Sequence, residues 1–411
     1  MDRNKRILIS CGRYEKNPSA NGICIRNIVS ELSSKVEKII VVSIEDKDGL
    51  IFKSGNVEVW GVGLSDFDFY RQNKANDCSK KRFPFNLKML CQKLFSAIKY
   101  PDVSWERSEK LLELVSKLIV ENDIDTYVAS YRPYDSIKVG IDLKKIFTNK
   151  IRVIGYHLDL LTAPSNKSRV IRIYKNLKIK KYIKKEIQLF DSIVLPNNTK
   201  TKFKSNKFKY ADFPLYKKNS LINEINTDFY SNSFINFAYI GTIDGSNRTI
   251  NYMYSLIKGL RNKTVKPIKM HIWGNITDRE NMKTILENSD FVYHGCLDPE
   301  YSSYVLSRAD FCINLSNIVT YKMIPSKIFQ LFSVKKPIIN IIEHPLDFSK
   351  PYFDKNGYTL SIGSYEDFDE NIGKIIEYLS TYYGSNKKEV PCSDNIYYEA
   401  TPEYVTRLLL E

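Results

Sequence analysis

The chain has 411 residues and a mass of 47.8 kDa, a length typical of roughly two or three domains. Hydrophobic residues make up 43% and charged residues 27% of the sequence, a balance that excludes global disorder and fibrous repeats. The formal net charge of +15 favours anionic partners such as nucleic acid, a membrane surface or phosphorylated substrates.

Cysteine use and hydropathy indicate a reduced, cytoplasmic protein. The seven cysteines form no CxxC pair, and several lie in apolar runs where a thiol behaves as a small hydrophobe, so we expect neither disulfides nor a zinc site. The apolar run after the basic start is far shorter than that of a signal peptide. No window approaches the ~18 apolar residues of a spanning helix.

Strands and helices are predicted to alternate along the first half. A short apolar run that ends in Gly12 is typical of a buried parallel strand, and the segment after it places apolar residues on one helical face. The predicted strands are 6–11, 38–44, 57–63, 126–131, 152–160 and 191–197, and the predicted helices are 23–35, 108–122 and 136–147. This alternation implies a parallel sheet with right-handed crossovers.

The second half repeats the alternation. Strands are predicted at 235–243, 268–275, 291–295, 310–316, 337–342 and 358–363, with helices at 248–262, 278–288, 299–309, 326–334 and 366–383. A stretch with little periodicity around Pro214 separates the halves. We therefore predict an α/β chain with Rossmann-like, doubly wound domains at 1–215 and 216–385. A tail or helix at 386–411 is predicted to pack back toward the N-terminal domain.

Ligands of open α/β sheets bind at the carboxyl ends of the strands, so the strand-to-helix loops are the places to search. Gly22, in NPSANG, opens a helix and could approach a phosphate or sugar closely, although an ordinary turn explains it as well. This loop lacks GxGxxG, which disfavours a nicotinamide site. In IGTIDGSNR, Arg248 could meet a diphosphate or could be a solvated first-turn residue.

Two further loops carry candidate residues. In IPSKIF, Ser326 offers a hydroxyl and Lys327 places an ammonium at the positive end of a helix, which is unfavourable unless an anion lies between them. In GYHLDLL, His157 follows a strand and is a candidate catalytic residue, with packing or capping as its alternative roles.

The segments FAYIGTIDGSNR, MHIWGN, FVYHGCLDPEYSSYVLSRADFCINLS and MIPSKIFQLFSVKKPII resemble the carboxyl-terminal domain of GT-B glycosyltransferases, in particular the retaining group 1 family. NPSANGICIRNIVSEL and GYHLDLL resemble the amino-terminal domain less specifically. The resemblance covers most of the chain and is most specific between Phe237 and Asn340. It implies two Rossmann-like domains that face a cleft.

The resemblance also implies roles for individual residues. Lys327 and Arg248 would be the cations for the donor diphosphate and, together with His157 near the sugar and its leaving phosphate, the catalytic residues. The residues implied to bind the donor are Gly22, Gly241, Thr242, Gly274, Tyr293, His294, Cys296, Ser326 and Gln330, with 293–296 meeting the nucleobase and Gln330 the ribose hydroxyls.

The sequence departs from the family pattern at several positions. Gln330 and Met323 stand where glutamates are usual, so the charged contacts to ribose and donor sugar are in question. Thr242 replaces a frequent arginine, and Arg248 is offset by about one residue from the usual basic position.

The resemblance implies a metal-independent, retaining glycosyltransferase without a cofactor, which uses a nucleotide sugar, with a UDP-sugar favoured. Its acceptor would be a glycan or a lipid-linked precursor of a cell-surface polysaccharide. A catalytically weak scaffolding member of the family and a nucleotide-sugar epimerase of the same fold remain alternatives.

Residues 167–185 carry nine Lys or Arg and no acid, interleaved with apolar residues. Such a segment favours contact with an anionic membrane surface, at the inner face of the cell membrane, although a solvated helix face is an equal alternative. We expect no nucleic-acid binding, because RNP and helix-turn-helix patterns are absent.

Overall fold

The computed structural model describes residues 4–15, 18–64, 105–131, 133–148, 150–158, 169–200, 205–217, 228–384, 390 and 396–411. The chain divides into two compact units. Unit 1 combines Met1–Pro214 with Glu399–Glu411, and unit 2 spans Leu215–Tyr398. The boundary predicted from the sequence lies after residue 215, and the tail predicted to pack back toward the N-terminal domain, 386–411, is longer than Glu399–Glu411.

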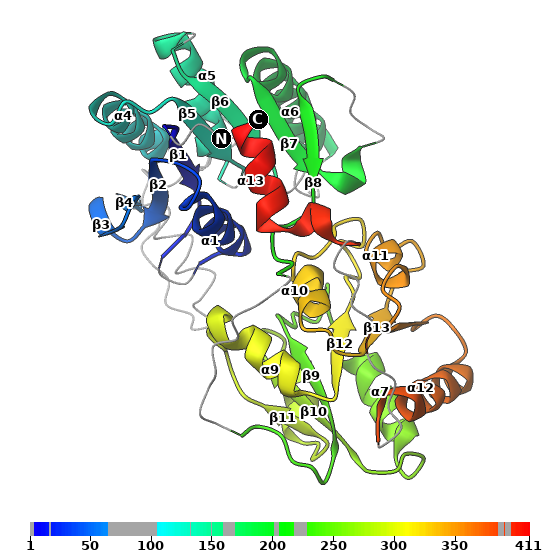
Figure 1. Cartoon of the computed structure of the whole chain (residues 1–411). Coiled ribbons are helices and arrows are strands. Elements are labelled where there is room, and N and C mark those ends of the chain that lie inside the picture. The colour runs from blue at the N-terminus through cyan, green and yellow to red at the C-terminus, as the bar shows by residue number, and fades with distance from the viewer. Residues whose placement is uncertain are drawn as a thin grey trace, which may run out of the picture. The chain divides into compact units, whose positions relative to one another are not determined.

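Unit 1 is built on an eight-stranded sheet in the order β3-β4-β2-β1-β5-β6-β7-β8 (Figure 1). Every neighbouring pair is parallel except β3 and β4. The strands are β1 (Arg6–Cys11), β2 (Lys38–Glu45), β3 (Gly49–Ser54), β4 (Val57–Gly63), β5 (Thr126–Ser130), β6 (Arg152–Tyr156), β7 (Ser192–Pro196) and β8 (Phe208–Ala211). The central strands are almost wholly buried, as expected for a parallel sheet covered on both faces.

The helices of unit 1 lie between these strands in the chain, except for the C-terminal helix. They are α1 (Ala20–Leu32), α4 (Trp105–Glu121), α5 (Asp135–Phe147), α6 (Arg169–Leu189) and α13 (Pro402–Leu410), with short 3-10 turns at Asn197–Thr199 and Tyr398–Ala400. The C-terminal helix α13, red in Figure 1, packs against α1 and β8. Arg152 extends its guanidinium to the carbonyl of Leu409, at 3.1 Å, so that the end of the chain is joined to the sheet.

Unit 2 has a six-stranded, fully parallel sheet in the order β11-β10-β9-β12-β13-β14. Its strands are β9 (Ile235–Ile240), β10 (Ile268–Trp273), β11 (Phe291–Tyr293), β12 (Phe311–Leu315), β13 (Ile338–Ile342) and β14 (Thr359–Gly363). Its helices are α7 (Asn251–Leu260), α8 (Arg279–Leu286), α9 (Ser302–Arg308), α10 (Lys327–Ser333), α11 (Lys350–Asp354) and α12 (Phe368–Tyr382). This is the doubly wound strand order in which the first and fourth strands are central neighbours.

Each sheet therefore has one point where the direction of the strand order reverses. In unit 1 this switch point lies between β1 and β5, and in unit 2 it lies between β9 and β12. Loops diverge there to opposite faces of the sheet and leave a crevice at the carboxyl edge, where ligands of such sheets bind. None of the helices in the described ranges is long and apolar enough to cross a membrane.

Candidate functional site

The backbone at the carboxyl edge of unit 2 is close-packed, and this depends on glycine. Gly274, directly after β10, has φ of +129°. A Cβ atom on Gly274 would lie 2.2 Å from the carbonyl oxygen of Gly241, directly after β9. These two glycines, both named by the sequence analysis, therefore let the ends of β9 and β10 lie side by side beneath the switch point.

Lys327 reaches this edge from the start of α10. Its Nζ lies 4.3 Å from the ring centroid of Tyr239 and 3.3 Å from the Tyr239 hydroxyl. A Cβ atom on Gly241 would be 3.1 Å from the same Nζ, so the ammonium lies next to the end of β9. Burial, together with the charge of Arg248, holds the pKa of Lys327 well below its ordinary value.

Arg248 is the second cation of this edge. Its Nε donates to Oδ1 of Asn317, at 2.9 Å, across the gap between the loops after β9 and β12. The nearby Asp244 is occupied by its own loop, because Oδ1 accepts the backbone N–H groups of Ser246, Asn247 and Arg248. Burial opposes ionisation of Asp244, but these N–H donors prevail and lower its pKa below its ordinary value.

Lys327 and Arg248 thus form a pair of like charges that repel each other. Within the described parts of the chain, neither has a carboxylate as an ion-pair partner; their side-chain partners are Tyr239 and Asn317, which are neutral. Burial raises the pKa of Tyr239 to about 12, so the phenol stays uncharged beside the two cations. An anion bound between them would relieve the repulsion, and this is the electrostatic character of a phosphate site.

Asn247 joins the two loops of the switch point. Its amide nitrogen donates to Asn317 Oδ1 at 3.2 Å and to Thr320 Oγ1 at 3.0 Å. Its Oδ1 accepts the backbone N–H groups of Val319 and Thr320, at 3.0 and 2.9 Å. The loop after β12 is therefore fixed against the loop that carries Arg248.

The predicted nucleobase segment lies at the end of β11. His294 stacks on Trp273 with ring centroids 4.2 Å apart and an interplanar angle of 10°. Its Nε2 lies 3.0 Å from Nδ1 of His271, whose own Nε2 is buried without a hydrogen-bond partner among the described residues. Burial and the charge of His294 lower the pKa of His271 to about 4. The Tyr293 hydroxyl donates to the Gly274 carbonyl at 2.9 Å, which ties this segment to β10.

The remaining predicted donor residues of unit 2 surround this edge. Thr242 and Cys296 are exposed, and Ser326 immediately precedes α10 without capping it through its side chain. Gln330, on α10, donates from Nε2 to Ser302 Oγ on α9, at 2.7 Å. Met323 is 39% exposed in the loop after β12. These donor roles stay predictions.

Two predicted residues belong to unit 1. A Cβ atom on Gly22 would lie 2.0 Å from the carbonyl oxygen of Arg13, so close packing of the preceding loop is sufficient reason for glycine there. His157 follows β6, is 6% exposed, stacks on Tyr131 with centroids 5.3 Å apart and contacts Glu186 through Nε2, at 2.5 Å. His157 is therefore a buried, paired histidine, and its contact with a donor sugar stays a prediction.

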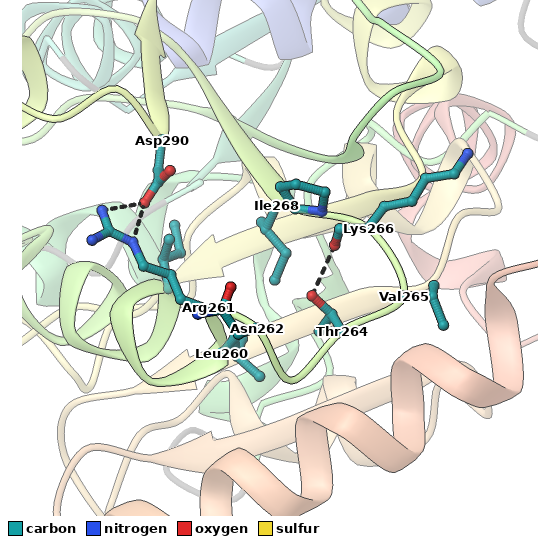
Figure 2. A pocket seen from close by; sticks show the side chains of 10 residues that line it. Leu260, Arg261, Asn262, Thr264, Val265, Lys266, Ile268 and Asp290 are labelled. Atoms are coloured by element: carbon teal, nitrogen blue, oxygen red, sulfur yellow. Dashed lines mark hydrogen bonds and ion pairs between the residues drawn. The ribbon is translucent and has the colours of Figure 1, made fainter.

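A small cavity of about 170 Å³ lies elsewhere in unit 2, at the amino-terminal end of β10. Figure 2 shows Arg261 on its wall, where Nε and Nη2 both donate to Oδ2 of Asp290, at 2.9 and 2.6 Å. The Thr264 hydroxyl donates to the Lys266 carbonyl at 2.8 Å. Because it lies at the opposite edge from the strand carboxyl ends, this cavity is not the candidate site.

Sequence reasoning missed the neutral partners of the cations, namely Tyr239, Asn247 and Asn317, and the carboxylate beside His157. Tyr239 lies two residues before Gly241 and Asn247 precedes Arg248, so their positions next to predicted residues were the available signals. Within the described ranges, no group of three or more His, Cys, Asp or Glu side chains is placed to hold a metal ion.

Comparison with known proteins finds similarity in structure and none in sequence. No family model matches the chain, and no curated protein matches its sequence. Among solved structures, WaaG, a glycosyltransferase involved in lipopolysaccharide biosynthesis, is similar with a TM-score of 0.56 and 9% identity, over 98% of this chain and 99% of that chain. A UDP-N-acetylglucosamine 2-epimerase is similar with a TM-score of 0.55 and 13% identity, over 100% and 95% of the two chains.

A variant of S. aureus TarM, in complex with fondaparinux, alpha-GlcNAc-glycerol and UDP, is similar with a TM-score of 0.54 and 10% identity, over 99% of this chain and 98% of that chain. Structural similarity at identities this low shows a shared fold but does not identify the substrate. The fold predicted from the sequence is confirmed: this chain has the two-domain GT-B fold that it shares with these glycosyltransferases and nucleotide-sugar epimerases.

Proposed function

We propose that this protein is a glycosyltransferase that moves a sugar from a nucleoside-diphosphate sugar, with a UDP-sugar favoured, to a hydroxyl group of a glycan or lipid-linked precursor of a cell-surface polysaccharide. One observation carries the proposal: Lys327 and Arg248 converge at the switch point of unit 2 with neutral side-chain partners. A diphosphate would supply an anionic partner, which neither cation has among the described side chains. The similarity to WaaG and to UDP-bound TarM supports the same choice.

The proposed reaction breaks the bond between the anomeric carbon and the diphosphate oxygen, and the electron pair leaves with the diphosphate. An acceptor hydroxyl oxygen forms the new bond to the anomeric carbon, and its proton is released. Lys327 and Arg248 would stabilise the charge on the leaving diphosphate, which is the largest electrostatic demand of such a transfer. A metal-independent reaction and retention of configuration are part of the proposal and follow from the family resemblance.

The direct test incubates purified protein with UDP-, GDP- and TDP-hexoses, without and with a glycan acceptor, and analyses the nucleotide and sugar products. If the protein releases a nucleoside diphosphate from the sugars of one nucleotide only, the result supports the proposal and identifies the donor nucleotide. Failure of every nucleotide to bind, measured by thermal shift, would contradict it, because a ligand that binds the folded state raises its stability.

A nucleotide-sugar 2-epimerase is the second candidate, favoured by an epimerase structure that matches the full length of this chain. Incubation with UDP-N-acetylglucosamine alone separates the two activities. An epimerase converts this substrate to an isomeric nucleotide sugar with the diphosphate intact, whereas a transferase leaves it intact or slowly hydrolyses it. A protein that binds the nucleotide but gives neither product would be the scaffolding alternative, which the residues Gln330 and Met323 keep open.

We also propose that α6 rests on an anionic membrane surface at the cytoplasmic face. The helix carries eight Lys or Arg, and its side chains Ile173, Tyr174 and Leu177 are 52%, 37% and 62% exposed. Cations that flank exposed apolar side chains fit the interface of an anionic bilayer, where each cation contributes about 1 kcal/mol.

Vesicle sedimentation tests this membrane contact. Full-length protein should sediment with phosphatidylglycerol vesicles at low salt, and Leu177→Glu should weaken binding, whereas Leu286→Glu should not. Leu286 is a matched control, because it is 68% exposed on a helix of unit 2. Equal loss in both variants, or no sedimentation of the unaltered protein, would contradict the proposal.

A further inference from the structure

The basic helix α6 carries one acidic residue, Glu186, and this residue points inward. Glu186 is 2% exposed, and its Oε1 lies 2.5 Å from Nε2 of His157, at the carboxyl end of β6. Because burial of a carboxylate is costly without a hydrogen-bonding partner, the imidazole is the group that makes this burial possible. The proposed membrane-facing helix is thus also the element that holds His157.

The surroundings of the pair fix its geometry. A Cβ atom on Gly155 would lie 2.5 Å from Oε1 of Glu186, so glycine at this position leaves the space that the carboxylate occupies. The imidazole stacks on Tyr131, and the backbone N–H of His157 donates to the Val194 carbonyl at 2.9 Å. One face of the ring, one ring nitrogen and the backbone of His157 are therefore all held by unit 1.

This arrangement distinguishes the two ring nitrogens. A carboxylate only accepts hydrogen bonds, so the tautomer in which Nε2–H donates to Glu186 is the one that satisfies an ionised Glu186. The neutral ring then has its lone pair on Nδ1, for which no hydrogen bond to a described residue is present. A buried carboxylate that accepts a hydrogen bond from one ring nitrogen fixes the tautomer of a histidine. The carboxylate thereby orients the imidazole so that its other nitrogen can contact a substrate.

We propose that Glu186 is a positioning residue that fixes the Nε2–H tautomer of His157 and keeps Nδ1 available to accept a hydrogen bond from a substrate hydroxyl. The inference rests on the proposed glycosyltransferase function, since a sugar is the source of that hydroxyl. It goes beyond it by assigning a role to Glu186 and a specific nitrogen to His157. The opposing view is that the pair only anchors α6 to the sheet.

Nuclear magnetic resonance of ¹⁵N-histidine-labelled full-length protein tests the tautomer without an activity assay. The chain has only four histidines, and His157→Gln identifies the signals of His157 by their disappearance. At a pH where the ring is neutral, we expect the Nε2–H tautomer in the unaltered protein and a mixture of tautomers in Glu186→Ala. An Nδ1–H tautomer in the unaltered protein, or unchanged signals in Glu186→Ala, would overturn the inference.

Kinetics then separates positioning from anchoring. We expect Glu186→Ala to lower kcat about 10²-fold, on the scale of misplacing one acid–base group, while the KM for the nucleotide sugar changes little. Glu58→Gln is the matched control, because Glu58 is also a buried glutamate of unit 1, paired with Lys38 at 3.1 Å and remote in sequence from β6. Unchanged kcat in Glu186→Ala that retains the native fold, or equal losses in both variants, would favour anchoring.

Failure of this inference is distinguishable from failure of the proposed function. UDP binding, which we assign to Lys327 and Arg248 in unit 2, should persist in Glu186→Ala. If UDP does not bind the unaltered protein, the proposed function fails, whereas the tautomer measurement still decides the role of Glu186.

Discussion

The carboxyl edges of the two sheets share a topology and differ in how their charged groups are partnered. In unit 2, Lys327 and Arg248 meet neutral partners at the point between β9 and β12. At the neighbouring carboxyl ends of β1 and β2 in unit 1, charges of both signs are present: Arg13 contacts Asp46 at 3.0 Å, and buried Glu45 accepts the backbone N–H of Tyr14 at 3.0 Å. The carboxyl edge of unit 1 thus holds carboxylates beside a cation, whereas Lys327 and Arg248 in unit 2 have neutral side-chain partners among the described residues.

We expect the largest loss of turnover from removing one of the two cations that lack a carboxylate partner among the described residues. Lys327→Ala should lower turnover ~10²-fold or more, because one preorganised electrostatic stabiliser of the leaving group is lost. Lys258→Ala is the matched control, since the ammonium of Lys258 also lies over a tyrosine ring, that of Tyr254 at 5.2 Å, on the exposed face of α7. Near-normal turnover in Lys327→Ala, or an equal loss in Lys258→Ala, would contradict the proposed role of the Lys327 ammonium.

The next prediction concerns the stability of unit 2 at acid pH, where His271 and His294 are in contact. The pKa of His271 is about 4 in the folded state and 6.5 as its ordinary value, so the folded protein disfavours the proton. Stability from this group is fully present above about pH 6.5 and is lost as the pH falls toward 4, by about 3 kcal/mol in total.

His271→Phe should remove this part of the acid sensitivity. Calorimetric unfolding at pH 7 and pH 4.5 measures the difference, and the unfolding transition of unit 2 should respond more than that of unit 1. An equal acid response in His271→Phe and the unaltered protein would show that other groups cause it.

Binding of UDP should also be accompanied by the uptake of a proton by Lys327. Because burial and Arg248 depress the pKa of Lys327, a bound diphosphate raises that pKa and takes up as much as about one proton. Affinity for UDP should therefore fall as the pH rises through the folded-state pKa of Lys327. Calorimetry in buffers of different ionisation enthalpy measures the uptake, which should vanish in Lys327→Ala; uptake that persists there belongs to another group.

The smallest effect concerns the ribose contact. In Gln330→Glu, a carboxylate replaces an amide and offers the ribose hydroxyls a stronger, charge-assisted acceptor. We expect about a fivefold gain in UDP affinity, equivalent to ~1 kcal/mol. Gln188→Glu, on the exposed side of α6, is the control for added negative charge and should not change UDP binding. A loss of affinity confined to Gln330→Glu would contradict the ribose assignment.

Local patterns in the sequence were sufficient for most of the fold. Continuous apolar runs identified the buried parallel strands, and the helices followed from their apolar faces. The strands β3 and β8 were missed because both are edge strands without a continuous buried run. In addition, β3 pairs antiparallel with β4 and is largely exposed. The sequence likewise predicts Lys327 and Arg248, because each stands in a loop directly after a strand or at a helix start.

The sequence does not reveal side-chain contacts between residues that a long connection separates along the chain. Lys327 meets Tyr239 across 88 residues, and His157 meets Glu186 across 29. Glu186 in particular follows a run of lysines, where an exposed salt-bridging residue is the ordinary expectation. Only the packing of α6 on the sheet makes it a buried partner of His157.

Hydrogen exchange with and without UDP tests whether the anion site lies between the loops after β9 and β12. In the unaltered protein, UDP should slow exchange in residues 241–248 and 317–327, the two loops that Asn247 joins. Lys327→Ala should not show this protection. If UDP binds and these two segments exchange at the same rate as before, the anion site lies elsewhere.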